Sequence, residues 1–403
     1  MLDISAFFTK NTNIRTVLLA ALILRTVWAL LVPVSPVADS SAYHMFAQNI
    51  AFKHQYAFAN GDITAYWPVG TSAIYALLYA LFGVSFLPIV IFNIIIGTGI
   101  VWLTYKIGQT YLSSATALTA AWIMALWPTF IQFTTILASE LIFIFFVLVA
   151  IYIWGNTKMP PIYRALFWGS MVCAAAYMRP TALPLIVLLP TIEWMHKRDM
   201  RACLTSLVVA ASAIALLIAP WAYRNYQQFG HPVLISTNGG VNLWMGNHPG
   251  SNGGANKEPV TPYDNEAERD AYLKREAISF ILHNPISYLE LAVKRAILTY
   301  KAETIGVHWN AALQKNLNNT TLSILKGLST LYWWAVIMLA CYGLYHLVPD
   351  KKVGLFHVLM IVPAYLFIFP ILTVGQDRYH LPINPFLAIY AAYAAQMYYI
   401  KRR

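Results

Sequence analysis

Charge is scarce in this chain of 403 residues. Asp, Glu, Lys and Arg make up 11% of it, and 59% of the residues are hydrophobic. Soluble domains are about a quarter charged. This composition excludes an ordinary soluble protein, because so much apolar side chain needs an apolar solvent such as a lipid bilayer. We therefore expect an all-α polytopic membrane protein.

Acidic residues are the scarcer kind of charge. The chain has 16 Asp and Glu against 27 Lys and Arg, for a net charge of +11. In a soluble protein this excess would suggest a nucleic-acid partner. In a membrane protein it indicates topology instead, because basic residues collect in cytoplasmic loops. We therefore expect membrane lipids, and no nucleic acid, among the partners.

Cysteine is also rare, and its three positions, Cys173, Cys203 and Cys341, lie inside apolar runs. No disulfide framework or metal-ligand spacing follows from them. No cofactor is expected, and a divalent metal is left open as the alternative. A cleavable signal peptide is not evident either, because Arg25 interrupts the first apolar run. Arg25 itself must pair internally or reach a wet cavity.

Long apolar runs, in contrast, are abundant. A membrane-spanning helix needs about 20 mostly apolar residues, and several runs come near that length. The sequence predicts about ten transmembrane helices. They are Ile14–Pro33, Ser85–Tyr105, Thr116–Thr134, Ile136–Trp154, Tyr163–Met178, Thr181–Met195, Cys203–Tyr223, Ile324–Leu347, Gly354–Thr373 and Leu381–Ile400.

Alternate linkers between these runs are basic, which predicts their orientation. Basic loops face the cytoplasm, so both termini are expected inside and the other set of loops outside. The basic linkers contain Lys10 and Arg15, Lys106, Lys158 and Arg164, residues 196–201, Lys351 and Lys352, and Lys401–Arg403.

One further apolar stretch, Tyr66–Phe82, would break this alternation if it crossed the membrane. We therefore expect an interfacial helix on the outer leaflet, where Tyr66, Trp67, Tyr75 and Tyr79 would suit the headgroup zone.

The chain is expected to have three parts. Residues 1–223 form an N-terminal transmembrane module whose first outer loop spans 34–82. Residues 224–323 form an outer region with amphipathic helices, and residues 324–403 form the C-terminal transmembrane helices. The outer region opens on a Gly/Asn-rich loop, STNGGVNLWMGNHPGSNGG, in which glycine permits positive φ angles and close backbone approach.

Two helices are predicted in the outer region. The first begins after Pro262 with Asp264 as its N-cap, and the second has Pro285 at its first position. In the second, Ile286, Leu289, Val293 and Ile297 recur at helical spacing. This pattern suits a helix on the membrane surface. An outer domain packed on itself is the alternative, and the sequence favours neither.

Charged residues gather where the predicted helices meet the outer face. They are Asp39, Glu140, Arg179, Arg224, Asp377 and Arg378. Each has a simple explanation on its own, since Asp39 could cap a helix and an arginine could reach to headgroups. Together at one depth they indicate function.

Arginine binds phosphate oxygens in bidentate fashion, and a carboxylate can take a proton from an attacking hydroxyl. A sugar linked to a lipid phosphate would need both groups at this depth.

The blocks ADSSAYHMFAQNIAFKHQYAF, AYWPVGTSAIYALLYALFG, ASELIFIFF, RPTALPL, PWAYRNYQQFGHPVLISTNGGVNLWMGNHP and DRYHLPINPFLAIYAA resemble the GT-C membrane glycosyltransferases. The likeness is to the branch shared by protein O-mannosyltransferases and the lipid A aminoarabinose transferase. It implies a GT-C fold and a polyprenyl-phosphate sugar donor.

The resemblance also implies roles for particular residues. Asp39 and Glu140 are the expected catalytic carboxylates, and Asp39 would act as the general base. Here Ser40 and Ser41 follow Asp39, where the mannosyltransferases often carry a second acid. The lipid phosphate would be bound by Arg179, Arg224 and Arg378, and the substrates by Tyr43, His54, Asn238, Asn242, Asp377 and Tyr379.

The expected function is sugar transfer from this donor to a hydroxyl of a glycan, lipid or protein, in an inner membrane with the site on the periplasmic or extracellular side. Two rivals stay open. A polymerase or ligase using a lipid diphosphate donor would rely on arginines and tolerate loss of Asp39. A lipid-sugar flippase would favour polar groups at mid-membrane and broken helices.

Overall fold

The computed structural model describes residues 13–349 and 353–400. Within them the regular elements are helices, so the all-α prediction is confirmed. Several basic residues that supported the predicted orientation lie outside the described residues, namely Lys10, Lys351, Lys352 and Lys401–Arg403.

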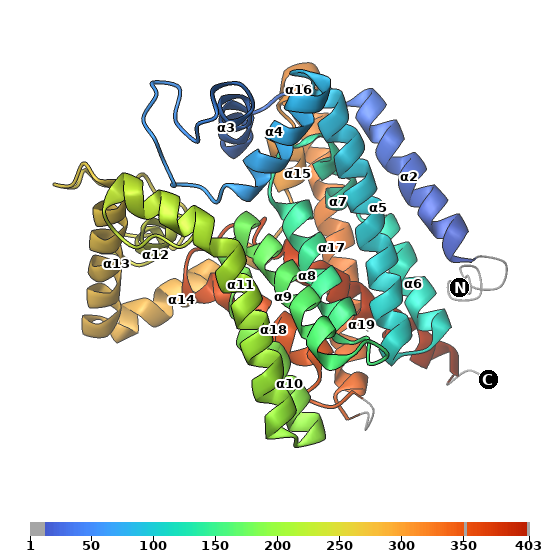
Figure 1. The fold of residues 1–403 in the computed structure, drawn as a ribbon. Coiled ribbons are helices and arrows are strands. Elements are labelled where there is room, and N and C mark those ends of the chain that lie inside the picture. The colour runs from blue at the N-terminus through green and yellow to red at the C-terminus, as the bar shows by residue number, and fades with distance from the viewer. Residues whose placement is uncertain (1–12, 350–352, 401–403) are drawn as a thin grey trace.

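The helices follow one another along the whole chain (Figure 1). They are α2 Ile14–Leu31, α3 Asp39–Lys53, α4 Gly70–Phe82, α5 Phe86–Tyr111, α6 Ser114–Ala125, α7 Pro128–Gln132, η1 Phe133–Thr135, α8 Glu140–Trp154, α9 Pro161–Met178, η2 Pro180–Ala182, α10 Leu185–Lys197, α11 Met200–Phe229, α12 Gly239–Gly246, α13 Glu266–His283, α14 Pro285–Tyr300, α15 Ile305–Trp309, α16 Ala311–Asn316, α17 Asn319–Leu347, α18 Val358–Leu372, η3 Leu381–Ile383 and α19 Asn384–Ile400.

Local sequence signals explain several helix ends. Asn13, Ser113 and Asp199 each precede a helix and accept a hydrogen bond from a backbone N–H of its first turn, at 3.1, 3.1 and 3.0 Å. Gly230 ends α11 with a φ of 69°, a left-handed conformation that glycine adopts without strain.

Large apolar side chains cover the outside of the longest helices. Leu30 of α2 is 81% exposed, Leu216 of α11 is 74% exposed and Met338 of α17 is 71% exposed. So much contiguous apolar surface is unfavourable in water and suits the hydrocarbon of a bilayer. Four described helices, α2, α5, α11 and α17, are long and apolar enough to cross a membrane. The protein is therefore an integral membrane protein with several apolar helices.

The helices long enough to cross a membrane are fewer than the ten predicted from the apolar runs: four among the described residues, or five if the bent pair of α6 and α7–η1 is one span. The run predicted as Thr116–Thr134 is not one straight helix, because α6 and the α7–η1 segment meet at 55° around Trp127 and Pro128. The apolar helices α8 and α18 have 15 residues each, about 22 Å at 1.5 Å per residue, whereas the hydrocarbon core is about 30 Å thick. The count of ten stays a prediction.

Arg25 lies inside the membrane part of α2 and is fully buried. Its Nη1 donates to the carbonyl oxygens of Ala21, at 3.1 Å, and Ala125, at 3.4 Å. Ala125 is the last residue of α6, so its carbonyl has no partner within its own helix. Arg25 therefore pairs internally through Nη1 alone, at the break between α6 and α7, whereas its Nε and Nη2 are buried and have no acceptor among the described residues.

The structure contains a helix, α4, within Tyr66–Phe82, as predicted, but two of its tyrosines do not lie where they were expected. Tyr75 and Tyr79, expected at the headgroups, are fully buried. The Tyr75 hydroxyl contacts the backbone of Ala138, and the Tyr79 hydroxyl lies 2.7 Å from His44 Nδ1. Both therefore point into the protein. Leu77 and other apolar residues of α4 are exposed instead, so its place on the outer leaflet stays a prediction.

The two outer helices α13 and α14 are present. The cap of α13 is Asn265, whose side chain accepts from Ala267 N at 2.9 Å, and not Asp264 as predicted. Pro285 begins α14, as predicted. The apolar residues of α14 that were predicted to share a face are all more than half exposed: Ile286, Leu289, Val293 and Ile297. They are therefore not the core of an outer domain packed on itself.

Candidate active site

The candidate active site lies where α8 begins and α9 ends, and these two helices pack against each other. Glu140 is the first residue of α8, and Arg179 follows the last residue of α9. Because the helix dipole favours an acid at a helix N-terminus, Glu140 is well placed there. Arg179 Nη2 forms an ion pair with Glu140, and its Nε donates to Ser139 Oγ at 3.0 Å. One guanidinium thus holds the start of α8 to the end of α9.

Asp39 is the first residue of α3, and its side chain makes no capping hydrogen bond. Its Oδ2 instead accepts from Arg378 Nη1 at 2.8 Å. Ala38, just before it, has a φ of 49°, and strained positions of this kind are common at functional sites. The capping explanation of Asp39 is therefore wrong.

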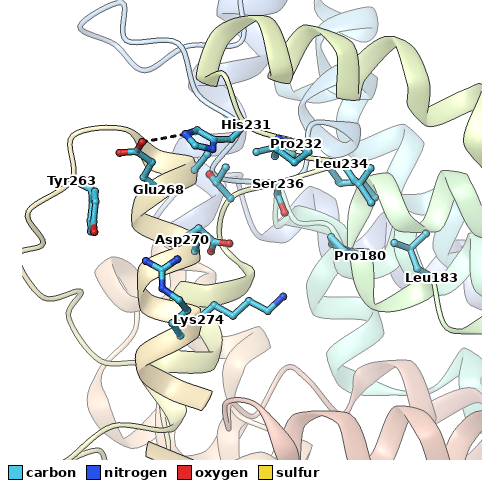
Figure 2. A pocket seen from close by; sticks show the side chains of 16 residues that line it. Pro180, Leu183, His231, Pro232, Leu234, Ser236, Tyr263, Glu268, Asp270 and Lys274 are labelled. Atoms are coloured by element: carbon cyan, nitrogen blue, oxygen red, sulfur yellow. Dashed lines mark hydrogen bonds and ion pairs between the residues drawn. The ribbon is translucent and has the colours of Figure 1, made fainter. Parts of the chain in front are cut away.

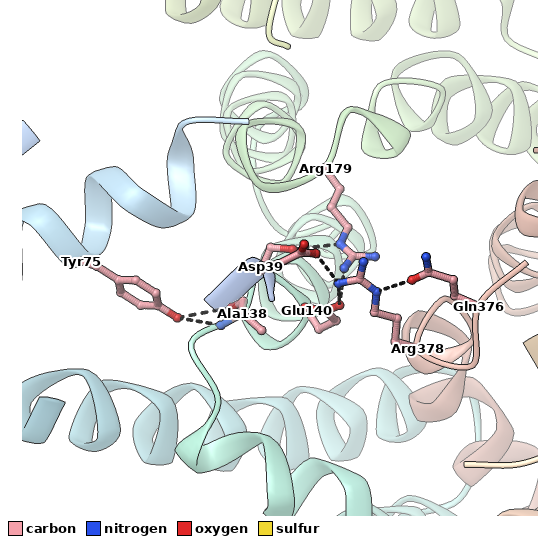
Figure 3. Close-up of polar contacts among 8 residues, drawn as sticks. Asp39, Tyr75, Ala138, Glu140, Arg179, Gln376 and Arg378 are labelled. Carbon is pink, nitrogen blue, oxygen red and sulfur yellow. Dashed lines mark hydrogen bonds and ion pairs between the residues drawn. The ribbon is translucent and has the colours of Figure 1, made fainter. Parts of the chain in front are cut away.

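Arg378 joins the two acids into one cluster (Figure 3). Its Nη1 lies 3.4 Å from Glu140 Oε1 as well as 2.8 Å from Asp39. Glu140 is 1% exposed and lies behind the arginines, whereas Asp39 is 24% exposed. Each arginine keeps one terminal nitrogen, Nη1 of Arg179 and Nη2 of Arg378, that has no acceptor among the described residues.

Aromatic rings fix the planes of both guanidinium groups. The Tyr379 ring centroid lies 5.5 Å from Arg179 and 5.3 Å from Arg378, and the Trp309 ring lies 4.4 Å from Arg378. Burial works against the charge of Arg378, but Tyr379, Asp39 and Glu140 more than compensate and raise its pKa above the usual value. Arg378 is therefore a permanent, oriented cation.

The cluster opens into a cavity of about 520 Å³. Asp39, Arg179 and Arg378 form its charged part, and Tyr43, Asn238, Asn242 and Tyr379, all predicted substrate contacts, also line it. The other walls are largely apolar, so the cavity has a charged end beside apolar walls. The apolar residues include Phe143, Met178, Leu243, Leu366, Phe369 and Pro370.

Two glycines bring the Gly/Asn-rich loop close to this cavity. Gly240 N donates to Asp270 Oδ1 at 2.6 Å, and a Cβ at Gly240 would lie 2.0 Å from the Asp270 carbonyl oxygen. A Cβ at Gly246 would lie 1.9 Å from the Thr373 carbonyl oxygen. At these two positions the backbones approach so closely that a side chain larger than that of glycine would not fit.

Three predicted residues lie away from the cluster. Arg224 donates to the carbonyl oxygens of Thr64 and Tyr56, at 2.9 and 3.1 Å, and does not line the cavity. His54 is exposed at the C-terminal end of α3. Asp377 Oδ2 accepts from Thr304 N at 3.2 Å and from its hydroxyl at 2.8 Å. Arg224 was expected to bind the lipid phosphate and Asp377 to bind a substrate. Both instead form hydrogen bonds with other parts of the protein.

The structure adds residues that the sequence analysis missed. Gln376 Oε1 accepts from Arg378 Nε at 2.7 Å and lines the cavity. Tyr66, also in the lining, donates to Glu258, and burial together with this carboxylate raises the pKa of its phenol. Ser139 and Gln376 adjoin predicted charges in the sequence and could have been found there. Trp309 carries no such signal.

A second cavity of about 660 Å³ lies between α13 and residues 231–237 (Figure 2). It shares Pro180 and Ser236 with the first cavity. His231 and Glu268 face each other across its rim, with His231 Nε2 3.1 Å from Glu268 Oε1. The two cavities are therefore neighbours along one wall. In the part of the chain that the structure describes, no group of three His, Cys, Asp or Glu side chains has a metal-binding arrangement.

Comparison with known proteins supports the fold. Residues 67–223 match the family described as dolichyl-phosphate-mannose-protein mannosyltransferase. The fold is similar to the Archaeoglobus fulgidus oligosaccharyltransferase in complex with Zn and sulfate (TM-score 0.59, 13% identity, 96% of this chain and 49% of that one). It is also similar to the same organism's AglB in complex with an inhibitory peptide and a dolichol-phosphate (TM-score 0.55, 13% identity, 96% and 50%).

ArnT from Cupriavidus metallidurans bound to undecaprenyl phosphate matches with a TM-score of 0.49 at 10% identity, over 94% of this chain and 76% of that one. No curated protein sequence matches significantly. The chain spans about half the length of the matched oligosaccharyltransferases. The resemblance seen in the sequence is confirmed: the chain has the GT-C fold, and its residues 67–223 match a family of glycosyltransferases.

Proposed function

We propose that the protein transfers a sugar from a polyprenyl-phosphate donor to an acceptor hydroxyl at the outer face of the membrane. The observation that carries this proposal is the pair of guanidinium groups, Arg179 and Arg378, at the charged end of an otherwise largely apolar cavity. Their free Nη atoms can bind phosphate oxygens, while the apolar walls can take the first isoprene units.

In the proposed reaction, the acceptor oxygen attacks the anomeric carbon of the donor. Asp39 Oδ1, which accepts no hydrogen bond from the described residues, takes the hydroxyl proton. The new bond forms between the acceptor oxygen and the anomeric carbon, and the bond from that carbon to the phosphate oxygen breaks. The lipid phosphate leaves with the electron pair, and attack from the opposite face inverts the carbon.

The departing phosphate gains negative charge, so Arg179 and Arg378 stabilise the transition state more than the ground state. Glu140 lies behind them and contacts both. We therefore assign Glu140 to holding the two guanidinium groups in place, and Asp39 to the proton transfer. Arg224 and His54 have no part in this reaction.

One observation favours the transport alternative: the helix is broken between α6 and α7. Arg25, the charge near that break, is fully buried and does not line either cavity described above. The charged groups that do line a cavity gather at helix ends, which favours chemistry there over passage through the membrane.

Binding of undecaprenyl phosphate to the purified protein in detergent tests the proposal. Undecaprenol, which has the same tail without the phosphate, is the matched control. We expect measurable binding of the phosphate and a much weaker signal from the alcohol. Equal binding of both lipids would mean that the arginines do not recognise phosphate.

A further inference from the structure

A buried polar cluster that the proposed reaction does not use lies beside the cavity. Glu303 belongs to the short connection between α14 and α15, and His380 follows Arg378 by two residues. Both side chains are fully buried, and His380 Nε2 lies 3.1 Å from Glu303 Oε1. A buried pair of this kind is costly unless all its hydrogen-bonding groups are satisfied.

The protonation of His380 follows from its partners. Its Nδ1 lies 2.7 Å from the carbonyl oxygen of Thr299, which can only accept, so Nδ1 carries a hydrogen. The contact between Nε2 and Glu303 then contains one shared proton. The ring stacks on Trp333, with centroids 4.1 Å apart and planes 24° apart. His380 is thereby fixed in both position and orientation.

Glu303 is the centre of the cluster, because groups from two further segments donate to it. Trp127 Nε1 lies 3.0 and 2.9 Å from its two oxygens, and Asn384 Nδ2 lies 3.0 Å from Oε1. Trp127 stands at the break between α6 and α7, and Asn384 begins α19. One carboxylate therefore joins the 299–304 segment to the broken helix and to the start of α19.

The residue before Arg378 is tied to the same segment. Asp377 accepts from both the N–H and the hydroxyl of Thr304, so Asp377 and His380 attach the chain on either side of Arg378. Between these two attachments, Arg378 reaches away to Asp39 and Glu140. The loop cannot rotate about one anchor, because the second one holds it.

We propose that Glu303, His380 and Asp377 are positioning residues that set Arg378 for binding of the donor phosphate. The inference rests on the proposed function and adds to it a part of the protein that touches neither substrate. Glu303 acts through His380 and the loop, so its loss should reach the donor only through Arg378. A residue with only a structural role would affect donor binding whether or not Arg378 is present, so this dependence on Arg378 distinguishes the two roles.

The test is a double-mutant cycle on the dissociation constant of undecaprenyl phosphate. Glu303→Gln keeps the size of the side chain but places an amide among the donors of Trp127, His380 and Asn384. We expect the affinity to fall about tenfold, the lower end of what loss of an outer partner costs at metal ligands. Arg378→Lys should also weaken binding. In the Arg378→Lys background, Glu303→Gln should change the affinity by less than about twofold.

Glu193→Gln is the matched control, because Glu193 also forms a buried ion pair, with Arg164 at 2.7 Å, but between α9 and α10. It should lower the thermal midpoint and leave the affinity unchanged. If Glu303→Gln does not fold, Asp377→Ala offers a second variant, since Asp377 is only partly buried. It should weaken binding in the wild-type background alone, and Asp377→Asn should restore most of the loss.

The outcomes separate the two proposals. Additive losses in the double variant, or an unchanged affinity in Glu303→Gln, would overturn the positioning role and leave the proposed function intact. Equal affinities of the wild type and Arg378→Lys would overturn the phosphate-binding role of Arg378, and the inference with it.

Discussion

Asp39 and Arg378 are 339 positions apart in the sequence, and their side chains form an ion pair of 2.8 Å. This contact joins the start of α3 to the loop before η3. It also places the proposed base beside a proposed phosphate ligand, which are the two groups that a transfer reaction needs within one donor's reach.

The first prediction concerns the arginines. Arg179→Lys and Arg378→Lys keep the charge but replace a planar fork by a point charge. We expect each to weaken binding of undecaprenyl phosphate about tenfold to a hundredfold, since a hydrogen bond to a charged group contributes about 1.5–3 kcal/mol. Titration of the purified variants would measure this.

Arg224→Lys distinguishes the structural assignment from the expectation based on sequence. Because Arg224 donates to backbone carbonyl oxygens outside the cavity, its replacement should lower the thermal midpoint and leave the lipid affinity near that of the wild type. A loss of affinity as large as in Arg179→Lys would return Arg224 to the phosphate site.

The second prediction concerns Asp39. Asp39→Asn retains an oxygen that can accept from Arg378 but removes the base. General-base help is worth about 10²–10⁴-fold in rate, so we expect a loss of transfer rate of that order with donor affinity largely kept. A ligase that depends on arginines alone would keep near-normal turnover in this variant, and comparison of rate with affinity therefore separates the two enzyme classes.

The third prediction concerns the exposed apolar face of α14. With the native cysteines replaced by serine, an environment-sensitive fluorophore on Leu289→Cys should be quenched by spin-labelled lipids in proteoliposomes. The same fluorophore on Glu290→Cys, one residue along and pointing to another face, should be quenched much less. Equal, weak quenching at both positions would mean that α14 does not lie on the membrane.

The fourth prediction concerns orientation. Lys257 and Lys197 are both exposed, and the basic loops predict that they lie on opposite sides of the membrane. A membrane-impermeant thiol reagent should label Lys257→Cys from outside in intact cells, and Lys197→Cys only after the cells are opened. Labelling of position 257 from the cytoplasmic side alone would reverse the topology.

Much of this organisation could be predicted from the sequence. The apolar runs predicted the helices. The charges at their outer ends predicted all four members of the charged cluster, Asp39, Glu140, Arg179 and Arg378, and all of these except Glu140 line the cavity. Such predictions succeed because lipid selects strongly for long apolar segments and makes charge near them rare.

Other features depend on tertiary contacts and were not predictable. Nothing local distinguishes Arg224 from Arg378, since each is an arginine at an outer helix end or loop, and only the fold decides which one meets Asp39. Tyr75 and Tyr79 fit an interfacial belt by type, but α4 turns them inward. The break at Trp127-Pro128, in contrast, could have been predicted, because the residue before a proline is disfavoured in helical conformation.

Sugar transfer onto an acceptor outside the cell is tested most directly by mass analysis of surface glycans from cells with the gene, without it, and with only the Asp39→Asn form. We expect one glycan species to lose the mass of a single sugar residue without the gene and in the Asp39→Asn cells, and the wild-type gene to restore it. Identical glycan profiles in all three would mean that the chain does not carry out this transfer.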